Sequence, residues 1–239
     1  MLIREVDHVC VKALDIAAAI RFYADILGGQ VISDTLSPDG RTRFVCIHYR
    51  GGVIELINAA ESAAQGYAHL AFLVDEGTLD AAYSRLALAG YDFTVKPRAT
   101  GSGDGRLAFF KDASGILYEL IERGGSIRQA PLRTGRVIAI DHLTLSVRQA
   151  HWDAAAAFFM ETLGFSRLSP NSFRFGADTV EFEPFDERYP GIRCVVFQVE
   201  SCEAITAELR GLSYDIALRD QSSAVMRGVA GERVVFVRR

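Results

Sequence analysis

Along the chain, short stretches in which apolar and polar residues alternate are separated by longer stretches with apolar residues three or four positions apart. Alternation is typical of strands that are buried on one face, and the longer spacing is typical of helices. Gly, Pro, Asp and Ser bound the short stretches, as turns require. The pattern predicts a strand at residues 5–11, a helix at 14–27 and strands near 30–34, 43–48 and 53–57.

The same order of elements then recurs. A strand is expected at residues 68–74, a helix at 77–89 and strands near 93–96, 107–110 and 116–121. A third copy starts at about residue 137, and a fourth starts at about 192 with its helix near 204–212. The repeating unit is therefore βαβββ, present four times.

The two halves of the chain are also similar residue by residue. Val6–Val11 reads VDHVCV and Ile140–Leu145 reads IDHLTL, and each precedes a helical pattern that ends in Leu-Gly. We expect Gly28 and Gly164 to adopt the left-handed conformation that ends many helices. The predicted organisation is one domain at residues 1–123, a polar linker at 124–136 and a second domain at 137–239.

One helix per unit does not cover both faces of a four-stranded sheet. We therefore expect pairs of units to curve their sheets around a shared cavity, with the helices outside. This predicts an α+β protein with two domains of curved, mixed sheets.

Composition narrows the class of protein. Almost half of the 239 residues are apolar, so a large core is expected, and the net charge of -4 does not indicate a nucleic-acid binder. Neither a run of about 18 apolar residues nor an N-terminal signal segment is apparent, so we expect no membrane partner and a cytoplasmic location. The scattered cysteines indicate buried thiols in a reducing compartment; they are Cys10, Cys46, Cys194 and Cys202.

Two histidines and two glutamates stand at matching places of the first two units. His8 and His69 lie on the first strand of each unit and are expected to face the cavity. Glu55 and Glu119 interrupt the apolar last strands, where a buried carboxylate is unfavourable unless it is paired or binds a metal. The set suits one divalent ion such as Ni, Co, Mn, Fe or Zn, with further positions open to water or substrate.

Other polar features are interpreted as structural. His48 and His151 have no matching partner in the repeat, and we expect them on the surface. The segment Gly101–Gly105 precedes a strand rather than a helix, so it predicts a flexible turn or lid and not a phosphate site.

These residues resemble the vicinal oxygen chelate superfamily, which includes glyoxalase I, methylmalonyl-CoA epimerase, fosfomycin- and bleomycin-resistance proteins and extradiol dioxygenases. The resemblance covers nearly the whole chain and is strongest in four segments: Val6–Val11, Phe22–Gly28, Gly66–Val74 and Lys111–Arg123. It implies two glyoxalase-like domains. It also implies that His8, Glu55, His69 and Glu119 match the ligands of glyoxalase I and the epimerase.

The second half departs from the family pattern. Cys194 stands where His69 does and Val235 where Glu119 does, whereas His142 and Glu181 are kept. One complete site is therefore expected. Because superfamily members pair their units within a half or by exchange, His142 and Glu181 are the alternative to His8 and Glu55. We favour pairing of consecutive units.

The resemblance implies three functions. The first is a metal-dependent lyase or isomerase that removes a proton next to a carbonyl, with Glu55 or Glu119 as base. The second is an Fe or Mn extradiol dioxygenase that uses His8, His69 and Glu119. The third is a non-catalytic binding or resistance protein. Each implies a small-molecule partner, and the chain is expected to be a monomer or a homodimer.

Overall fold

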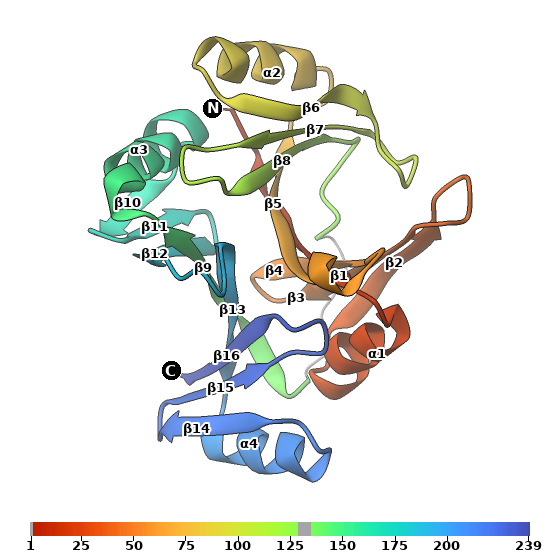
Figure 1. The fold of residues 1–239 in the computed structure, drawn as a ribbon, viewed down its shortest axis with the longest axis vertical. Helices are drawn as coiled ribbons and strands as arrows, with labels where there is room; N and C mark the ends of the chain where they lie inside the picture. Colours follow the sequence, from red (N-terminus) through yellow and green to blue (C-terminus); the bar gives the residue numbers. More distant parts are fainter. Residues whose placement is uncertain (1, 129–134) are drawn as a thin grey trace.

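The computed structural model describes residues 2–128 and 135–239. They form two mixed sheets of eight strands each, shown in Figure 1. The first sheet has the strand order β2-β3-β4-β1-β5-β8-β7-β6, and the second has the order β10-β11-β12-β9-β13-β16-β15-β14. Each half of the chain therefore builds its own sheet, and the two orders are the same apart from an offset of eight strands.

The first half contains the elements β1 (Glu5–Ala13), α1 (Ile16–Ile20), η1 (Arg21–Ile26), β2 (Gln30–Leu36), β3 (Arg43–Tyr49), β4 (Gly52–Asn58), η2 (Ser62–Ala64), β5 (Gly66–Val74), α2 (Leu79–Leu88), β6 (Asp92–Ala99), β7 (Arg106–Lys111) and β8 (Leu117–Glu122).

The second half contains β9 (Val137–Val147), η3 (Gln149–His151), α3 (Trp152–Ala157), η4 (Phe158–Leu163), β10 (Ser166–Ser169), β11 (Ser172–Phe175), β12 (Asp178–Pro184), β13 (Gly191–Val199), α4 (Cys202–Gly211), β14 (Ile216–Asp220), β15 (Ser223–Arg227) and β16 (Arg233–Arg238).

The first strands of consecutive units meet at the centre of each sheet. β1 is antiparallel to β5, and each is parallel to the last strand of its own unit, β4 and β8 respectively. β9, β13, β12 and β16 repeat this arrangement in the second sheet. The expected α+β fold of four βαβββ units in two glyoxalase-like domains is confirmed, and consecutive units are the ones that pair.

The helix expected at residues 14–27 divides into two parts. α1 is regular, and the chain then widens into the π-helical turn η1; the second half does the same in α3 and η4. Phe22 and Tyr23, which are adjacent in η1, are both fully buried. Gly28 and Gly164 have φ of 85° and 86°, which confirms the expected left-handed glycines after both helices.

α1 and α3 lie where the two halves meet, whereas α2 and α4 lie at opposite ends of the molecule (Figure 1). In η4, the Phe158 ring packs against Phe110 and Tyr118 of the first half, with ring centroids 5.9 and 5.2 Å apart. In η1, Phe22 lies 5.3 Å from Tyr214 of the second half. The hydrophobic core is therefore continuous from one sheet to the other.

The structure also bears on the cysteines, on membrane-spanning helices and on the expected linker. All four cysteines are free and buried, as the sequence predicted. Among the described residues, no helix has the length and apolar character needed to cross a bilayer. The expected linker at 124–136 falls partly on residues 129–134, outside the described residues, so the domain boundaries stay a prediction.

Candidate metal centre

Two central strands bring the two histidines of the first half together. β1 and β5 run antiparallel with Cys10 opposite His69, and irregularities in register stand on both sides of the stretch from His8 to Cys10. Such irregularities change the direction of side chains locally. The Nε2 atoms of His8 and His69 lie 3.2 Å apart, and both side chains are almost fully buried.

The two glutamates approach from the outer strands. Glu55 pairs with Cys10 across β1 and β4, and Glu119 pairs with Ala71 across β5 and β8. An oxygen of Glu119 lies 2.8 Å from His69 Nε2 and 3.5 Å from His8 Nε2. An oxygen of Glu55 lies 3.3 Å from His8 Nε2. All four residues that the sequence singled out therefore converge at the centre of the first sheet.

Burial and mutual charge shift the pKa values in this cluster. Burial lowers the pKa of His8, but the negative charge of Glu55 and hydrogen bonds to Asp7, Glu119 and Glu55 outweigh it and raise this pKa well above its ordinary value. Burial alone would raise the pKa of Glu119, but hydrogen bonds from His69 and His8 bring it down to about 2. In the cation-free protein, positive charge from a proton is therefore held between the carboxylates.

The donor set fits a divalent cation. Nδ1 of His8 donates a hydrogen bond of 2.7 Å to Asp7, so Nε2 is the ring nitrogen directed at the cluster. Two imidazole nitrogens and two carboxylates then face one another, and no Lys or Arg side chain among the described residues forms an ion pair with either glutamate. Nitrogen and oxygen donors of this kind suit a transition-metal ion, which would replace the shared proton.

The sequence interpretation assigned no role to Asp7, although this residue supports the cluster. Asp7 is fully buried, and it accepts hydrogen bonds from His8 Nδ1 and, at 2.9 Å, from Arg123. Arg123 also forms an ion pair of 3.1 Å with Asp104, on the glycine-rich turn. The signal was present in the sequence, because an aspartate precedes the histidine in both halves.

Cys10 was likewise not assigned to the site. Its thiol belongs to a second group of potential ligands with Glu55 and His69, whose donor atoms lie within 4.8 Å of one another. Burial and the nearby Glu55 and Glu119 raise the pKa of Cys10 well above its ordinary value. The thiol is therefore protonated in the cation-free protein and lies beside the Glu55 carboxylate.

The second sheet keeps half of this arrangement. His142 Nδ1 donates to Asp141 at 2.7 Å, and His142 Nε2 lies 3.5 Å from Glu181. Cys194 pairs with Thr144 as His69 pairs with Cys10, and Val235 pairs with Val196 as Glu119 pairs with Ala71. His142 and Glu181 lie in the second sheet, apart from His69 and Glu119.

His48 and the turn at Gly101–Gly105 lie outside the cluster of four residues. The prediction that His48 lies on the surface is wrong, because its residue is only 6% exposed. Burial and the charge of Arg128 lower the pKa of His48, so the ring is held neutral. At Gly101–Gly105, the described turn is held by Asp104, which accepts hydrogen bonds from the hydroxyl groups of Thr100 and Ser102.

Residues 5–120 match the family model described as the Glyoxalase/Bleomycin resistance protein/Dioxygenase superfamily. The matched segment is 116 of the 239 residues, so the first half of the chain is similar to this superfamily. The match spans both units of the first half, which contains the four converging residues. The description of this superfamily names proteins of several kinds, so the match does not specify one reaction.

Known proteins similar to the chain differ in their reactions. The metallothiol transferase FosB of Shouchella clausii (strain KSM-K16) is 38% identical over 56 residues, which is 23% of this chain and 38% of that relative. The 2,3-dioxygenase LapB from Pseudomonas sp. KL28 has a TM-score of 0.69 at 16% identity, with coverage of 100% of this chain and 93% of LapB. A Mn(II)-bound glyoxalase from Novosphingobium aromaticivorans has a TM-score of 0.68 at 17% identity, covering 99% and 82%. At these identities the structural likeness establishes the fold.

Proposed function

We propose that the first half binds one divalent metal ion through His8, Glu55, His69 and Glu119. The observation that carries this proposal is the convergence of two Nε2 atoms and two carboxylates. The Nε2 atoms lie 3.2 Å apart, and each carboxylate has an oxygen within 3.3 Å of one of them. Burying such a set is unfavourable without a shared cation. The Mn(II) bound to the Novosphingobium aromaticivorans glyoxalase agrees with a cation of this class.

The proposed reaction is removal of a proton next to a carbonyl of a small-molecule substrate, as in a lyase or isomerase of glyoxalase or epimerase type. The metal ion would act as a Lewis acid that stabilises negative charge on the substrate oxygen. Glu55 is the proposed base, because its side chain is 15% exposed and that of Glu119 only 4%. Glu119 contacts both histidines, whereas Glu55 contacts His8 alone and is the more exposed carboxylate, so Glu55 is the better placed to accept a proton from a substrate.

A ring-cleaving dioxygenase is the second candidate. Its support is the group formed by His8, His69 and Glu119, whose donor atoms lie within 4.8 Å of one another without Glu55. Two histidines and one carboxylate are the ligand set of many iron oxygenases. In this case Glu55 would lie next to the metal ion without being required as a ligand.

Metal analysis tests the centre itself. Purified protein should hold about one divalent ion per chain, and His69→Ala and Glu119→Ala should lose it. His142 offers a matched control, because it also donates to a preceding aspartate and faces a glutamate. His8→Ala should lose the ion and His142→Ala should keep it. Full occupancy in the folded His69→Ala and Glu119→Ala variants would refute the proposal.

Glu55→Gln distinguishes the two reactions. For a lyase or isomerase, the variant should keep most of its metal and lose proton abstraction, measured as deuterium uptake from D₂O by a panel of hydroxycarbonyl compounds. For a dioxygenase, the Fe(II)-loaded variant should retain oxygen consumption with a panel of catechols. If the wild type consumes oxygen with catechols and Glu55→Gln consumes it at the same rate, the lyase or isomerase is rejected.

A further inference from the structure

The second sheet has a hollow whose lining differs from the metal centre in charge. It has a volume of about 410 Å³, within the range of small-molecule sites. Five arginines and three carboxylates line it, an excess of two positive charges: Arg188, Arg193, Arg219, Arg227, Arg233, Glu183, Asp186 and Asp215.

The hollow lies on the face of the second sheet that corresponds to the metal-binding face of the first. In the first sheet, Phe109 pairs with Glu119 and its ring lies 5.0 Å from that of His69. In the second, Val225 pairs with Val235 in the same way. Arg233 is two residues from Val235 on β16 and therefore shares its face. Arg227 pairs directly with Arg233.

Not all of these arginines are neutralised. Arg193 lies 2.7 Å from Glu183, and Arg188 lies 2.9 Å from Asp186, so these four charges are paired. By contrast, no carboxylate among residues 2–128 and 135–239 forms an ion pair with Arg219, Arg227 or Arg233. Three guanidinium groups from three adjacent strands therefore line one hollow, and no carboxylate of the described residues lies within ion-pairing distance of them.

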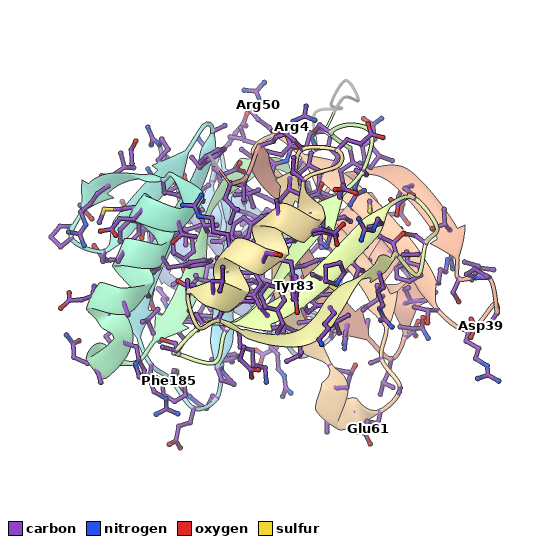
Figure 2. The ribbon with its side chains drawn as sticks, turned by 90° about the horizontal axis from the view of Figure 1, so that it is seen from above. Arg4, Asp39, Arg50, Glu61, Tyr83 and Phe185 are labelled. Atoms are coloured by element: carbon purple, nitrogen blue, oxygen red, sulfur yellow. The ribbon has the colours of Figure 1, made fainter. Side chains whose placement is uncertain are left out.

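The rest of the lining agrees with a ligand site. Ala217 and Val225, which pair across β14 and β15, add apolar groups to the lining. The loop after β12, which carries Asp186 and Arg188, borders the hollow at the outer edge of the second half, where Figure 2 labels the neighbouring Phe185. Glu181 also lies on β12, but its carboxylate contacts His142 and accepts a hydrogen bond from Ser172, and it does not line the hollow.

We propose that this hollow binds a small organic dianion, a phosphate ester or a dicarboxylate, through Arg219, Arg227 and Arg233. Planar guanidinium groups form paired hydrogen bonds with both phosphate and carboxylate oxygens, and two neighbouring arginines match two negative charges. The same face that concentrates carboxylates for a cation in the first sheet thus concentrates arginines for an anion in the second. This inference does not depend on the proposed reaction of the metal centre.

Calorimetric titration of the full-length protein tests the site, with inorganic phosphate and succinate as probes at constant ionic strength. We expect one dianion per chain with a Kd of about 1 mM or lower. Arg227→Gln and Arg233→Gln should each weaken binding about tenfold, since each removes one charged contact. Arg85→Gln removes the same charge from an exposed position on α2 and should leave the Kd unchanged.

The titration is repeated in His69→Ala, because a bound metal ion could itself attract the probe. Binding that persists in His69→Ala assigns the anion to the second sheet, whatever the fate of the metal proposal. Preference for phosphate or succinate identifies the ligand chemistry. The proposal is overturned if the wild type shows no saturable binding, or if Arg227→Gln and Arg233→Gln both leave the Kd unchanged. It is also overturned if Arg85→Gln weakens binding equally, or if His69→Ala loses binding.

Discussion

At the scale of single residues, the candidate centre depends on what holds its histidines. Asp7 is fully buried between His8 and Arg123, and it fixes which ring nitrogen of His8 faces the cluster. Asp141 makes the same contact to His142 and pairs with Arg239 at 2.6 Å. The support is therefore present in both halves, whereas the complete set of proposed ligands is present in the first.

Replacing Asp7 with Asn should weaken metal binding while the fold is kept. The amide no longer carries the charge that orients and polarises the imidazole, and loss of such a support weakens metal affinity roughly 10- to 100-fold. Competition with a fluorescent chelator measures the affinity. Asp141→Asn is the matched control and should leave it unchanged; equal affinities in all three proteins would show that Asp7 has no part in the centre.

Asp178 makes stability depend on pH. Burial raises the pKa of Asp178 to about 6, although Arg128 lies 2.9 Å away and acts in the opposite direction. The folded protein therefore holds this proton more tightly than the unfolded chain does. The resulting stabilisation is complete below about pH 4 and is lost as the pH rises through about 6.

Between pH 4 and pH 7, the free energy of unfolding of the wild type should fall by about 2 kcal/mol relative to Asp178→Asn. The Asn variant cannot titrate at this position, so the difference between the two proteins isolates Asp178. Urea denaturation at a series of pH values gives both curves. Parallel curves over this range would contradict the prediction.

At the scale of elements, the π-helical turns connect the halves. η1 and η4 both place two adjacent aromatic residues in the interior, because these segments pack against both halves of the chain. Phe158 thereby reaches Phe110 and Tyr118, and its neighbour Phe159 reaches Phe173 and Phe182 of its own unit. One short segment thus packs against both sheets.

Phe158→Ala should destabilise the protein by about 3 to 5 kcal/mol, because it leaves a cavity that surrounding aromatic rings fill only partly. Leu88→Ala is the control: Leu88 is 90% exposed on α2, and its loss should change stability by less than about 0.5 kcal/mol. Chemical denaturation compares the two. A loss below about 1 kcal/mol in Phe158→Ala would mean that this contact does not hold the halves together.

At the scale of the whole molecule, a metal bound only by the first half should stabilise the entire chain. The core is continuous across both sheets, so we expect the halves to unfold together. Ligand at a hundredfold excess over its Kd contributes about 2.7 kcal/mol to the folded state.

Chelation should therefore lower the Tm of the wild type in a single transition. His69→Ala already lacks a complete site and should show the same Tm with and without chelator. Differential scanning calorimetry measures both. Two separate transitions, of which chelator shifts only one, would show that the halves unfold independently.

The sequence by itself determined the repeat and the order of elements, and it singled out His69 and Glu119 with two alternatives for the other pair of residues, either His8 and Glu55 or His142 and Glu181. Alternation fixes which strand residues share a face, and a charged residue in an apolar strand stands out without any coordinates. The glycines at 28 and 164 could be anticipated for the same local reason, since a left-handed backbone strongly favours residues without a Cβ.

The tertiary structure decided what depends on contacts between distant segments. Only the pairing of β1 with β5 brings His8 rather than His142 to His69, and no local pattern distinguishes these two histidines. The burial of His48 and the influence of Arg128 on its pKa also arise from neighbours far along the chain. Local preferences define strands and helices, but burial, charge pairing and pKa are set by whichever segments the fold packs together.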